Sequence, residues 1–513
     1  MQKWAIGSVW AFSFVIRRRL TFLGFAWSTL VALRADFPFA EATIDDLQAR
    51  MSAGGLTAEA LTAAYLERIE QVDRGGPRLN AVIEINPDAL AVAGQLDAER
   101  RRGQVRGPLH GIPVLIKDNI ATADKMETTA GSLALVGSKP PRDAHLVSRL
   151  REAGAVILGK TNMSEWANFR GERSISGWSA RGGQTRNPYV LDRSPSGSSS
   201  GSAVAVAANL CVAAIGTETN GSIISPSSVG GVVGLKPTVG LVSRHGIIPI
   251  AASFDTAGPI TRTVGDAAIM LRVLAGTDGR DEATAAVPAD WKARWREVPT
   301  VRALQGARIG VLRAVEARGV DKLLAAAVVV LRTAGAEIVE VGSLPDLASA
   351  GPARIEVMLY EMKVGINAYL AELGPSARFK TLAAVIRFND ENWAREQPLF
   401  GQQYFQRAEG KGPLTDPAYL EARALVSRLA RTEGIDRLME TYRLDALVGG
   451  GVSLAAMAGY PSVTVPFEEN EGVPVGFLFY GRAWSEARLL ALAADFEQRT
   501  RARREPAFKA KFP

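Results

Sequence analysis

Residues 194–210, SPSGSSSGSAVAVAANL, decide how the rest of the chain is interpreted. Tracts rich in glycine and serine often form flexible linkers. Here, however, Pro195 stiffens the entry, and an apolar helical stretch at 203–210 follows without a polar spacer. A glycine-rich turn that opens a buried helix can instead hold an anion or a nucleophile. The stretch is therefore either a linker or part of an active site.

Helix and strand patterns alternate on both sides of this stretch, with Thr43 as the expected N-cap of the first helix. We expect helices at 43–51, 57–73, 89–102, 144–154, 321–335 and 486–499, and strands at 79–85, 111–119, 155–162, 212–218, 307–313, 337–341, 445–450 and 461–467. This alternation predicts α/β layers around a mostly parallel or mixed sheet. No repeat or low-complexity linker interrupts 42–504, and the charged stretch 290–302 is interpreted as a surface connection. We therefore expect a single domain over 36–513.

Composition argues against a nucleic-acid partner. The 513 residues are 47% apolar and 22% charged, which is ordinary for a soluble globular enzyme. Five of the seven net positive charges precede the first acidic residue, Asp36, so the remainder of the chain carries only +2. Those five are Lys3, Arg17, Arg18, Arg19 and Arg34. The basic cluster at 499–504 is interpreted as a solvated helix end.

Cysteine and histidine are scarce. Cys211 is the only cysteine, so no intrachain disulfide can form, and it is interpreted as a small buried hydrophobe. The three histidines are His110, His145 and His245, and so small a number does not predict a histidine-rich metal site.

The N-terminal segment is expected to lie outside the fold. Residues 17–35 have a cationic start, an apolar run and a small residue at the end, which is the pattern of an export signal. Residues 4–16 are also largely apolar, which is unusual ahead of such a signal. We favour a removed export signal over 1–35 and a periplasmic protein, with an uncleaved N-terminal anchor or a cytoplasmic protein as alternatives. Neither run reaches the roughly 20 residues of a membrane span, so no stable membrane insertion of the mature domain is expected.

One nucleophile hypothesis lies inside the opening stretch. Residues 197–201 match the G-x-S-x-G elbow of α/β-hydrolases, which would make Ser199 the nucleophile. That elbow also needs a later acid followed by a histidine. His245 is the only later histidine, 46 residues on, and this short interval argues against a hydrolase triad.

A lysine base is the alternative. Lys117 ends an apolar strand, where burial favours the neutral amine that can accept a proton. A purely structural role, with Lys117 pairing with Asp118, remains open. Further on, 216–228 leaves an apolar strand, turns through Asn220 and Gly221, and presents Ser222. Successive backbone N–H groups in such a turn can form an oxyanion pocket.

Four motifs now stand in order: GIPVLIKDN at 111–119, SGSSSGSA at 196–203, GTETNGSI at 216–223 and GVVGLKPTVGLVS at 231–243. Together they resemble the amidase signature enzymes over essentially 42–504. The separation of 24 positions from Ser198 to Ser222 matches the spacing of that family. The segments 174–189 and 499–506 are most similar to bacterial peptide amidases within it. The resemblance implies an α/β/α sandwich around a large mixed, twisted central sheet.

The resemblance also implies a Ser-Ser-Lys triad. Ser222 would be the nucleophile, and Ser198, on a cis peptide bond, would relay its proton to neutral Lys117. Ser199 would support the triad by hydrogen bonding. The implied oxyanion donors are the backbone N–H groups of Thr219, Asn220, Gly221 and Ser222.

The implied activity is hydrolysis of carboxamides, above all the C-terminal amide of peptides, to free acid and ammonia through an acyl-enzyme. This chemistry requires no metal or organic cofactor. We expect a small-molecule or peptide amide as substrate, no nucleic acid, and a monomer or homodimer. The alternative is a glutamine-hydrolysing amidotransferase subunit that resembles the glutamyl-tRNA amidotransferase A subunit.

Two features depart from the family pattern. Asn220 stands where many relatives carry glycine or aspartate. In addition, only the glycine run 449–451 joins the strand at 445–450 to AGYPS at 458–462, where relatives place a loop of a couple of dozen residues. Because that loop shapes the substrate pocket in the family, its shortening predicts an altered substrate range.

Overall fold

The computed structural model describes residues 37–511 apart from 296–301, 313–317, 343 and 345–346. The predicted export signal at 1–35 and residues 296–301 of the connection at 290–302 lie outside the described residues. Across the described part of the chain, no helix combines the length and apolar character that a membrane crossing needs.

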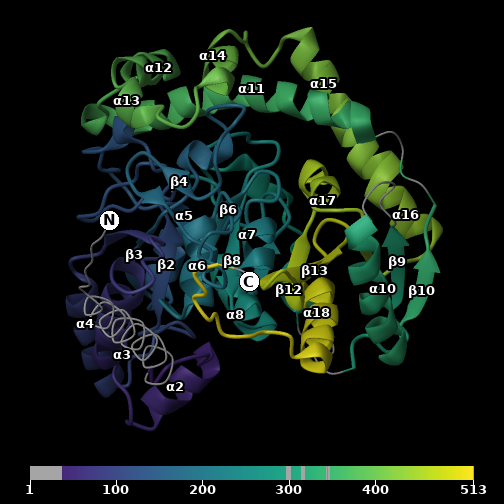
Figure 1. Cartoon of the computed structure of the whole chain (residues 1–513), viewed down its shortest axis with the longest axis horizontal. Coiled ribbons are helices and arrows are strands. Elements are labelled where there is room, and N and C mark those ends of the chain that lie inside the picture. Colours follow the sequence, from purple (N-terminus) through teal and green to yellow (C-terminus); the bar gives the residue numbers. More distant parts are fainter. Residues whose placement is uncertain (1–36, 296–301, 313–317, 343, 345–346, 512–513) are drawn as a thin grey trace, which may run out of the picture.

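A mixed central sheet, formed by eleven strands of the described residues, organises the molecule (Figure 1). In spatial order these are β1 (Val82–Ile85), β3 (Val156–Thr161), β2 (Pro113–Lys117), β6 (Ala213–Glu218), β8 (Thr256–Thr261), β7 (Val233–Lys236), β12 (Ser462–Asn470), β13 (Val473–Tyr480), β11 (Ala446–Gly449), β9 (Arg308–Leu312) and β10 (Glu337–Glu340). The parallel pairs are β3–β2, β2–β6, β11–β9 and β9–β10, and the other neighbours are antiparallel. A small separate ribbon pairs β4 (Trp178–Ser179) with β5 (Gly183–Gln184). The predicted α/β class with a mixed sheet is confirmed.

Helices flank this sheet. Those of the sheet body are α2 (Ile44–Ser52), α3 (Ala58–Arg68), α4 (Ala89–Arg101), α5 (His145–Glu152), α6 (Ser200–Ala207), α7 (Ile224–Val229), α8 (Val264–Leu274), α9 (Trp291–Arg294), α10 (Arg318–Thr333), α17 (Ser453–Ala458) and α18 (Glu486–Thr500). The helices α2, α4, α5, α10 and α18 begin and end within a few residues of the predicted positions, and Thr43 caps α2 through a capping box, as expected. The helices α7, α8, α9 and α17 were not predicted. The helix expected over 57–73 is α3 followed by a π-helical turn at Ile69–Arg74.

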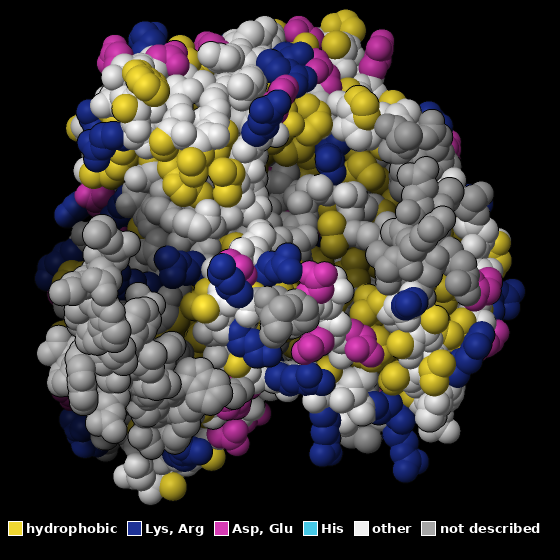
Figure 2. Space-filling view, in the orientation of Figure 1, with side chains coloured by type: hydrophobic (Ala, Val, Ile, Leu, Met, Phe, Trp, Pro, Cys, Tyr) yellow, Lys and Arg dark blue, Asp and Glu magenta, His cyan; other side chains and the backbone are white. Residues whose placement is uncertain are grey.

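A second set of helices arches over one side of the sheet and is called here the helical layer (Figure 1). It consists of α11 (Leu347–Glu372), α12 (Leu382–Glu391), α13 (Trp393–Glu396), α14 (Gln403–Glu409), α15 (Pro417–Ser427) and α16 (Asp436–Thr441). Its apolar side chains form a second core together with α17, with residues from 130–135, 163–169 and 248–254, and with single residues of β9, β11 and β13. The surface drawn in Figure 2 is hollowed just below this layer.

The opening stretch is buried at the centre of the sheet body. Every residue of α6 is buried, so the linker hypothesis is wrong. A Cβ at Gly201 would overlap the carbonyl oxygens of Ala81 and Asn162. Glycine is therefore required here because two backbone segments press against the start of the helix.

A buried ionic cluster ties the helical layer to the 164–171 segment. The Arg170 guanidinium lies 2.8 Å from the Glu165 carboxylate and 3.5 Å from that of Glu396, and it stacks over the ring of Phe400 at 4.3 Å. All three charged side chains are fully buried. Burial raises the pKa of Glu165 well above its ordinary value, although Arg170 opposes this shift. The cluster thus fixes one end of the segment that borders the site described below.

We expect Arg170→Met to destabilise the fold by about 3–5 kcal/mol, because it leaves two carboxyl groups buried without their cation. Urea unfolding followed by circular dichroism measures this loss. The matched control is Arg407→Met, which breaks a 3.0 Å ion pair with Glu172 whose members are both about half exposed, and it should cost no more than about 1 kcal/mol. Equal losses in the two variants would contradict a structural role for the cluster.

Candidate active site

Four separate segments converge at one edge of the sheet. Lys117 ends β2, and Thr217 stands near the end of β6, the parallel neighbour of β2. Because parallel strands end at the same edge, their last side chains lie close together. Ser198 precedes α6 and Ser222 precedes α7, and both turns meet this edge. The structure thus gathers all the residues predicted for the site.

Lys117 occupies the centre of the site. Its Nζ lies 2.7 Å from Ser198 Oγ, 3.0 Å from Ser199 Oγ and 2.9 Å from Thr217 Oγ1. The side chain is completely buried, and this burial lowers its pKa to about 7, against the attraction of the Asp255 and Glu218 carboxylates. Near neutral pH a large fraction of Lys117 is therefore an uncharged amine that can accept a proton.

Burial alone does not single out Lys117. Lys160 and Lys236 are also completely buried, and burial lowers the pKa of each to about 8. Lys160 Nζ donates to Thr128 Oγ1 at 2.9 Å, and Lys236 Nζ donates to the Pro237 carbonyl oxygen at 3.1 Å. What distinguishes Lys117 among the described residues is its contact with the two serine hydroxyls.

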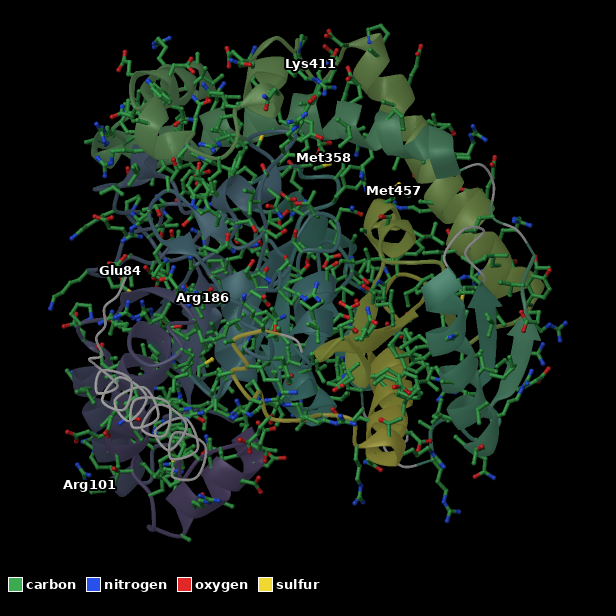
Figure 3. All side chains as sticks on the ribbon, in the orientation of Figure 1. Glu84, Arg101, Arg186, Met358, Lys411 and Met457 are labelled. Carbon is green, nitrogen blue, oxygen red and sulfur yellow. The ribbon has the colours of Figure 1, made fainter. Side chains whose placement is uncertain are left out.

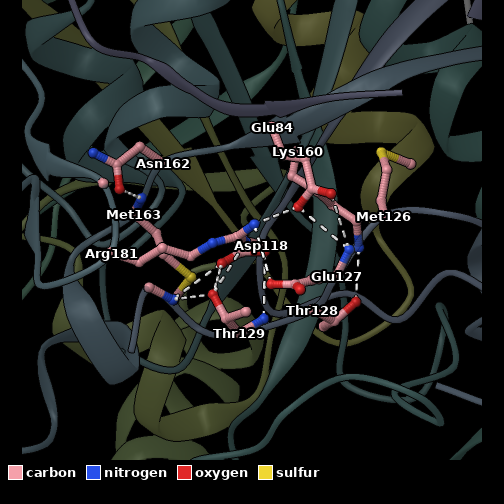
Figure 4. Close-up of polar contacts among 12 residues, drawn as sticks. Glu84, Asp118, Met126, Glu127, Thr128, Thr129, Lys160, Asn162, Met163 and Arg181 are labelled. Carbon is pink, nitrogen blue, oxygen red and sulfur yellow. Dashed lines mark hydrogen bonds and ion pairs between the residues drawn. The ribbon is translucent and has the colours of Figure 1, made fainter. Parts of the chain in front are cut away.

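The neighbouring Asp118 belongs to a different network (Figure 4). Its carboxylate accepts a hydrogen bond from Gly131 N–H at 3.1 Å and another from the Thr129 hydroxyl, and it lies 3.4 Å from the Arg181 guanidinium. Arg181 also pairs with Glu84. The alternative in which Lys117 simply pairs with Asp118 is therefore wrong, and the Asp118 network instead anchors the chain just after Lys117.

Backbone contacts hold the two serine turns together. The peptide bond between Gly197 and Ser198 is cis, as the family resemblance implies. Ser199 N–H donates to the carbonyl oxygen of Ser222 at 3.1 Å. Ser199 Oγ donates to the Thr217 carbonyl oxygen at 3.0 Å and accepts from Thr217 N–H at 3.2 Å.

The elbow hypothesis, with Ser199 as nucleophile and His245 as its base, does not fit these contacts. The hydroxyl of Ser199 is already bound to the end of β6. His245, the only histidine that could serve such an elbow, lies with its Nε2 3.3 Å from the Glu372 carboxylate.

The turn at 219–222 is organised by two carboxylates. The Glu218 carboxylate accepts from the N–H groups of Gly221 at 2.8 Å and Ile223 at 2.7 Å. Asp255 accepts from the Thr219 hydroxyl, and burial raises the pKa of Asp255 to about 6. Gly221 has a φ of +82°, which glycine adopts without strain. Of the four expected oxyanion donors, Gly221 N–H thus already has an acceptor in this structure.

A cavity of about 280 Å³ opens onto Ser222 and is called here the nucleophile cavity. The 167–174 segment forms one wall, and the helical layer forms the other. The residues that the layer contributes are Arg354, Ile355, Met358 and Tyr404. Figure 3 shows Met358 on the side of α11 that faces the sheet body. Sequence patterns did not identify any of these four.

The glycine run leaves open space beside the nucleophile turn. Gly449, Gly450 and Gly451 all have positive φ, so the backbone turns sharply from β11 into α17. An apolar cavity of about 270 Å³ lies here, and Ile224 of α7 and Val452 contribute to its walls. The direct glycine connection between β11 and α17 thus coincides with a cavity next to the site.

Comparison with known proteins decides the family. A family model described as Amidase matches residues 60–449. The chain belongs to the amidase family. This amidase is similar to the peptide amidase of Stenotrophomonas maltophilia, whose structure shares 54% sequence identity at a TM-score of 0.88 and aligns over 92% of this chain and 100% of that one.

The relatives of this amidase include a protein named as an amidase and proteins named as amidotransferase A subunits. A probable amidase of Arabidopsis thaliana is 42% identical over 94% of each chain. The glutamyl-tRNA(Gln) amidotransferase A subunit of Halorhodospira halophila is 35% identical over 89% of this chain and 97% of its own length. The amidase signature fold and an amide-hydrolysing activity are thereby established for the enzyme.

Proposed function

We propose that this amidase hydrolyses the C-terminal amide of peptides to the free acid and ammonia, through an acyl-enzyme on Ser222. The observation that carries the proposal is the 2.7 Å contact between the Nζ of a buried lysine, Lys117, and the hydroxyl of Ser198. The similarity to a peptide amidase supports the substrate class.

In the proposed mechanism, neutral Lys117 accepts the hydroxyl proton of Ser198 while Ser198 takes that of Ser222. The Oγ of Ser222 attacks the amide carbonyl carbon and forms a tetrahedral intermediate. The proton then returns through the same relay to the leaving nitrogen, since an amide anion is a very poor leaving group. The C–N bond breaks and ammonia departs. Water, activated in the same way, releases the acid from Ser222.

The oxyanion is assigned to the turn that precedes α7, where backbone N–H groups at 219–222 stabilise developing negative charge. Because Gly221 N–H is bonded to Glu218 at 2.8 Å, we assign the direct contacts to Thr219, Asn220 and Ser222. Gly221 then contributes by holding the turn in shape. Ser199, bound to Thr217, acts as a support for the relay.

An amide panel scored by ammonia release tests the proposal. A dipeptide with a C-terminal amide should release ammonia, and the same dipeptide as free acid should release none. Free glutamine serves as the discriminating substrate, because the similarity to amidotransferase A subunits favours glutamine hydrolysis as the second candidate. Turnover of glutamine only when partner subunits are added, with none of the peptide amide, would reverse the assignment.

A further inference from the structure

One face of α11 brings a positive charge to the nucleophile cavity. Arg354 lies four residues before Met358 on this helix, and residues four positions apart share a helix face. Both side chains line the cavity onto which Ser222 opens. The side of α11 that carries Met358 faces the sheet body (Figure 3). Arg354 therefore belongs to the wall that the helical layer contributes.

The Arg354 guanidinium has no partner among the described residues. Its Nε is buried without a hydrogen bond, and no ion pair holds the group within the described part of the chain. The side chain as a whole is only partly buried. The two terminal nitrogens are not among the buried atoms without a partner, so they are the exposed part of the group. Their N–H donors are available to a molecule in the cavity that Arg354 lines.

Tyr404 is the aromatic neighbour of this guanidinium. Burial lowers the pKa of Arg354, and the Tyr404 phenol opposes this shift. The Tyr404 ring stacks on that of Phe169 with 4.4 Å between the centroids, and both rings line the cavity. Because the ordinary pKa of arginine lies above 12, the guanidinium remains charged near neutral pH. Arg354 is therefore a cation beside a stacked pair of rings.

The positive charge of Arg354 is not balanced within the cavity wall. Glu172 is the only other charged residue among the described residues that line the cavity, and its carboxylate pairs with Arg407 at 3.0 Å. A partly buried cation without a counter-ion loses solvation free energy, and charged groups that are withdrawn from water in proteins are usually paired. We therefore expect a negatively charged group on the molecule that occupies the cavity.

We propose that Arg354 binds the carboxylate of an acidic side chain on the residue whose amide Ser222 attacks, so that the enzyme prefers peptides that end in a glutamate amide. This preference rests on the proposed function and leaves its bond changes as they are. A guanidinium donates two parallel hydrogen bonds to a carboxylate, which an alkyl side chain cannot accept. Since Ser222 and Arg354 line one cavity of about 280 Å³, a single residue can contact both.

Three peptide amides test the preference: acetyl-alanyl-glutamate amide, acetyl-alanyl-norvaline amide and acetyl-alanyl-lysine amide. Norvaline has the carbon chain of glutamate with a methyl group in place of the carboxylate. The readout is kcat/KM for each peptide, from ammonia release. The glutamate amide should exceed the norvaline amide by at least about tenfold, the range of a hydrogen bond to a charged group. The lysine amide should be the slowest, because its ammonium is repelled by Arg354.

Two substitutions at Arg354 and one control locate the preference. Arg354→Gln should bring the ratio of glutamate amide to norvaline amide close to one, with the norvaline amide within about threefold of its native kcat/KM. Arg354→Lys should keep part of the ratio, because it retains the charge but not the two-pronged geometry. Arg387 is exposed on α12 and lies outside the cavity, so Arg387→Gln should leave the ratio unchanged.

Urea unfolding separates substrate binding from a structural role. Because Arg354 has no partner among the described residues, Arg354→Gln should not lower the urea midpoint. A lower midpoint, with equal losses of kcat/KM for all three peptides, would assign Arg354 to support of the fold and overturn the proposed preference.

Failure of the preference is distinguishable from failure of the proposed function. Hydrolysis of all three peptides at similar rates by the native enzyme overturns the preference and leaves the proposed function standing. The same ratio in Arg354→Gln and Arg387→Gln overturns the preference as well. No hydrolysis of any of the peptide amides overturns the proposed function and the preference with it.

Discussion

Ser222→Ala should abolish ammonia release from a peptide amide, with a loss of at least about 10⁴-fold in kcat, the scale on which a missing nucleophile acts in serine hydrolases. The variant retains the fold, because the Ser222 contact that joins the two serine turns is made by its backbone carbonyl oxygen. Steady-state ammonia release, with circular dichroism to confirm folding, measures the effect. A fluorophosphonate reagent should add mass to the native chain at Ser222 and none to the variant.

Ser225→Ala is the matched control, since Ser225 stands three residues further on in α7 and lies outside the nucleophile cavity. It should keep both turnover and the adduct. Substantial turnover in Ser222→Ala, or an adduct located at Ser199, would move the nucleophile to another serine and refute the proposed relay.

Activity should rise with pH through about 7. In Lys117→Met, activity should fall by at least about 10³-fold. Burial lowers the pKa of Lys117 to about 7, so below that pH the group is protonated and cannot accept a proton from Ser198. kcat/KM should therefore fall about tenfold per pH unit well below 7 and reach a plateau above it. Initial rates of ammonia release from pH 5 to 9 measure this profile.

Lys236→Met removes another completely buried lysine, one that binds a carbonyl oxygen rather than a serine. This control should keep the inflection near pH 7. Lys117→Arg should not restore activity, because a guanidinium remains charged throughout this range. A profile that is flat from pH 5 to 9, or turnover in Lys117→Met, would remove Lys117 from the mechanism.

Most helices and strands of the sheet body could be predicted from sequence because their apolar patterns are local. The strand that ends at Lys117 and the helix that follows residue 88 show clear apolar patterns, and both form as expected over β2 and α4. The family resemblance carried by the four ordered motifs also anticipated that Lys117, Ser198 and Ser222 lie close together. Strands β7, β8 and β13 escaped notice because glycine or proline interrupts each of them.

The helical layer did not follow from sequence, and with it one wall of the nucleophile cavity was missed. The apolar residues of α11 are spread around the helix, because it packs on several sides, and Pro352 interrupts its pattern. Met358 and Tyr369 therefore carried no local signal, although each lines a cavity.

The helix α11 contributes Arg354, Ile355 and Met358 to the nucleophile cavity, whereas the proton relay is built entirely from the sheet body. Substitutions in α11 can therefore change the shape of the nucleophile cavity while Lys117 and Ser198 keep their contact. This separation makes α11 the natural segment to vary, by selection or by design, when a new substrate is wanted from unchanged chemistry.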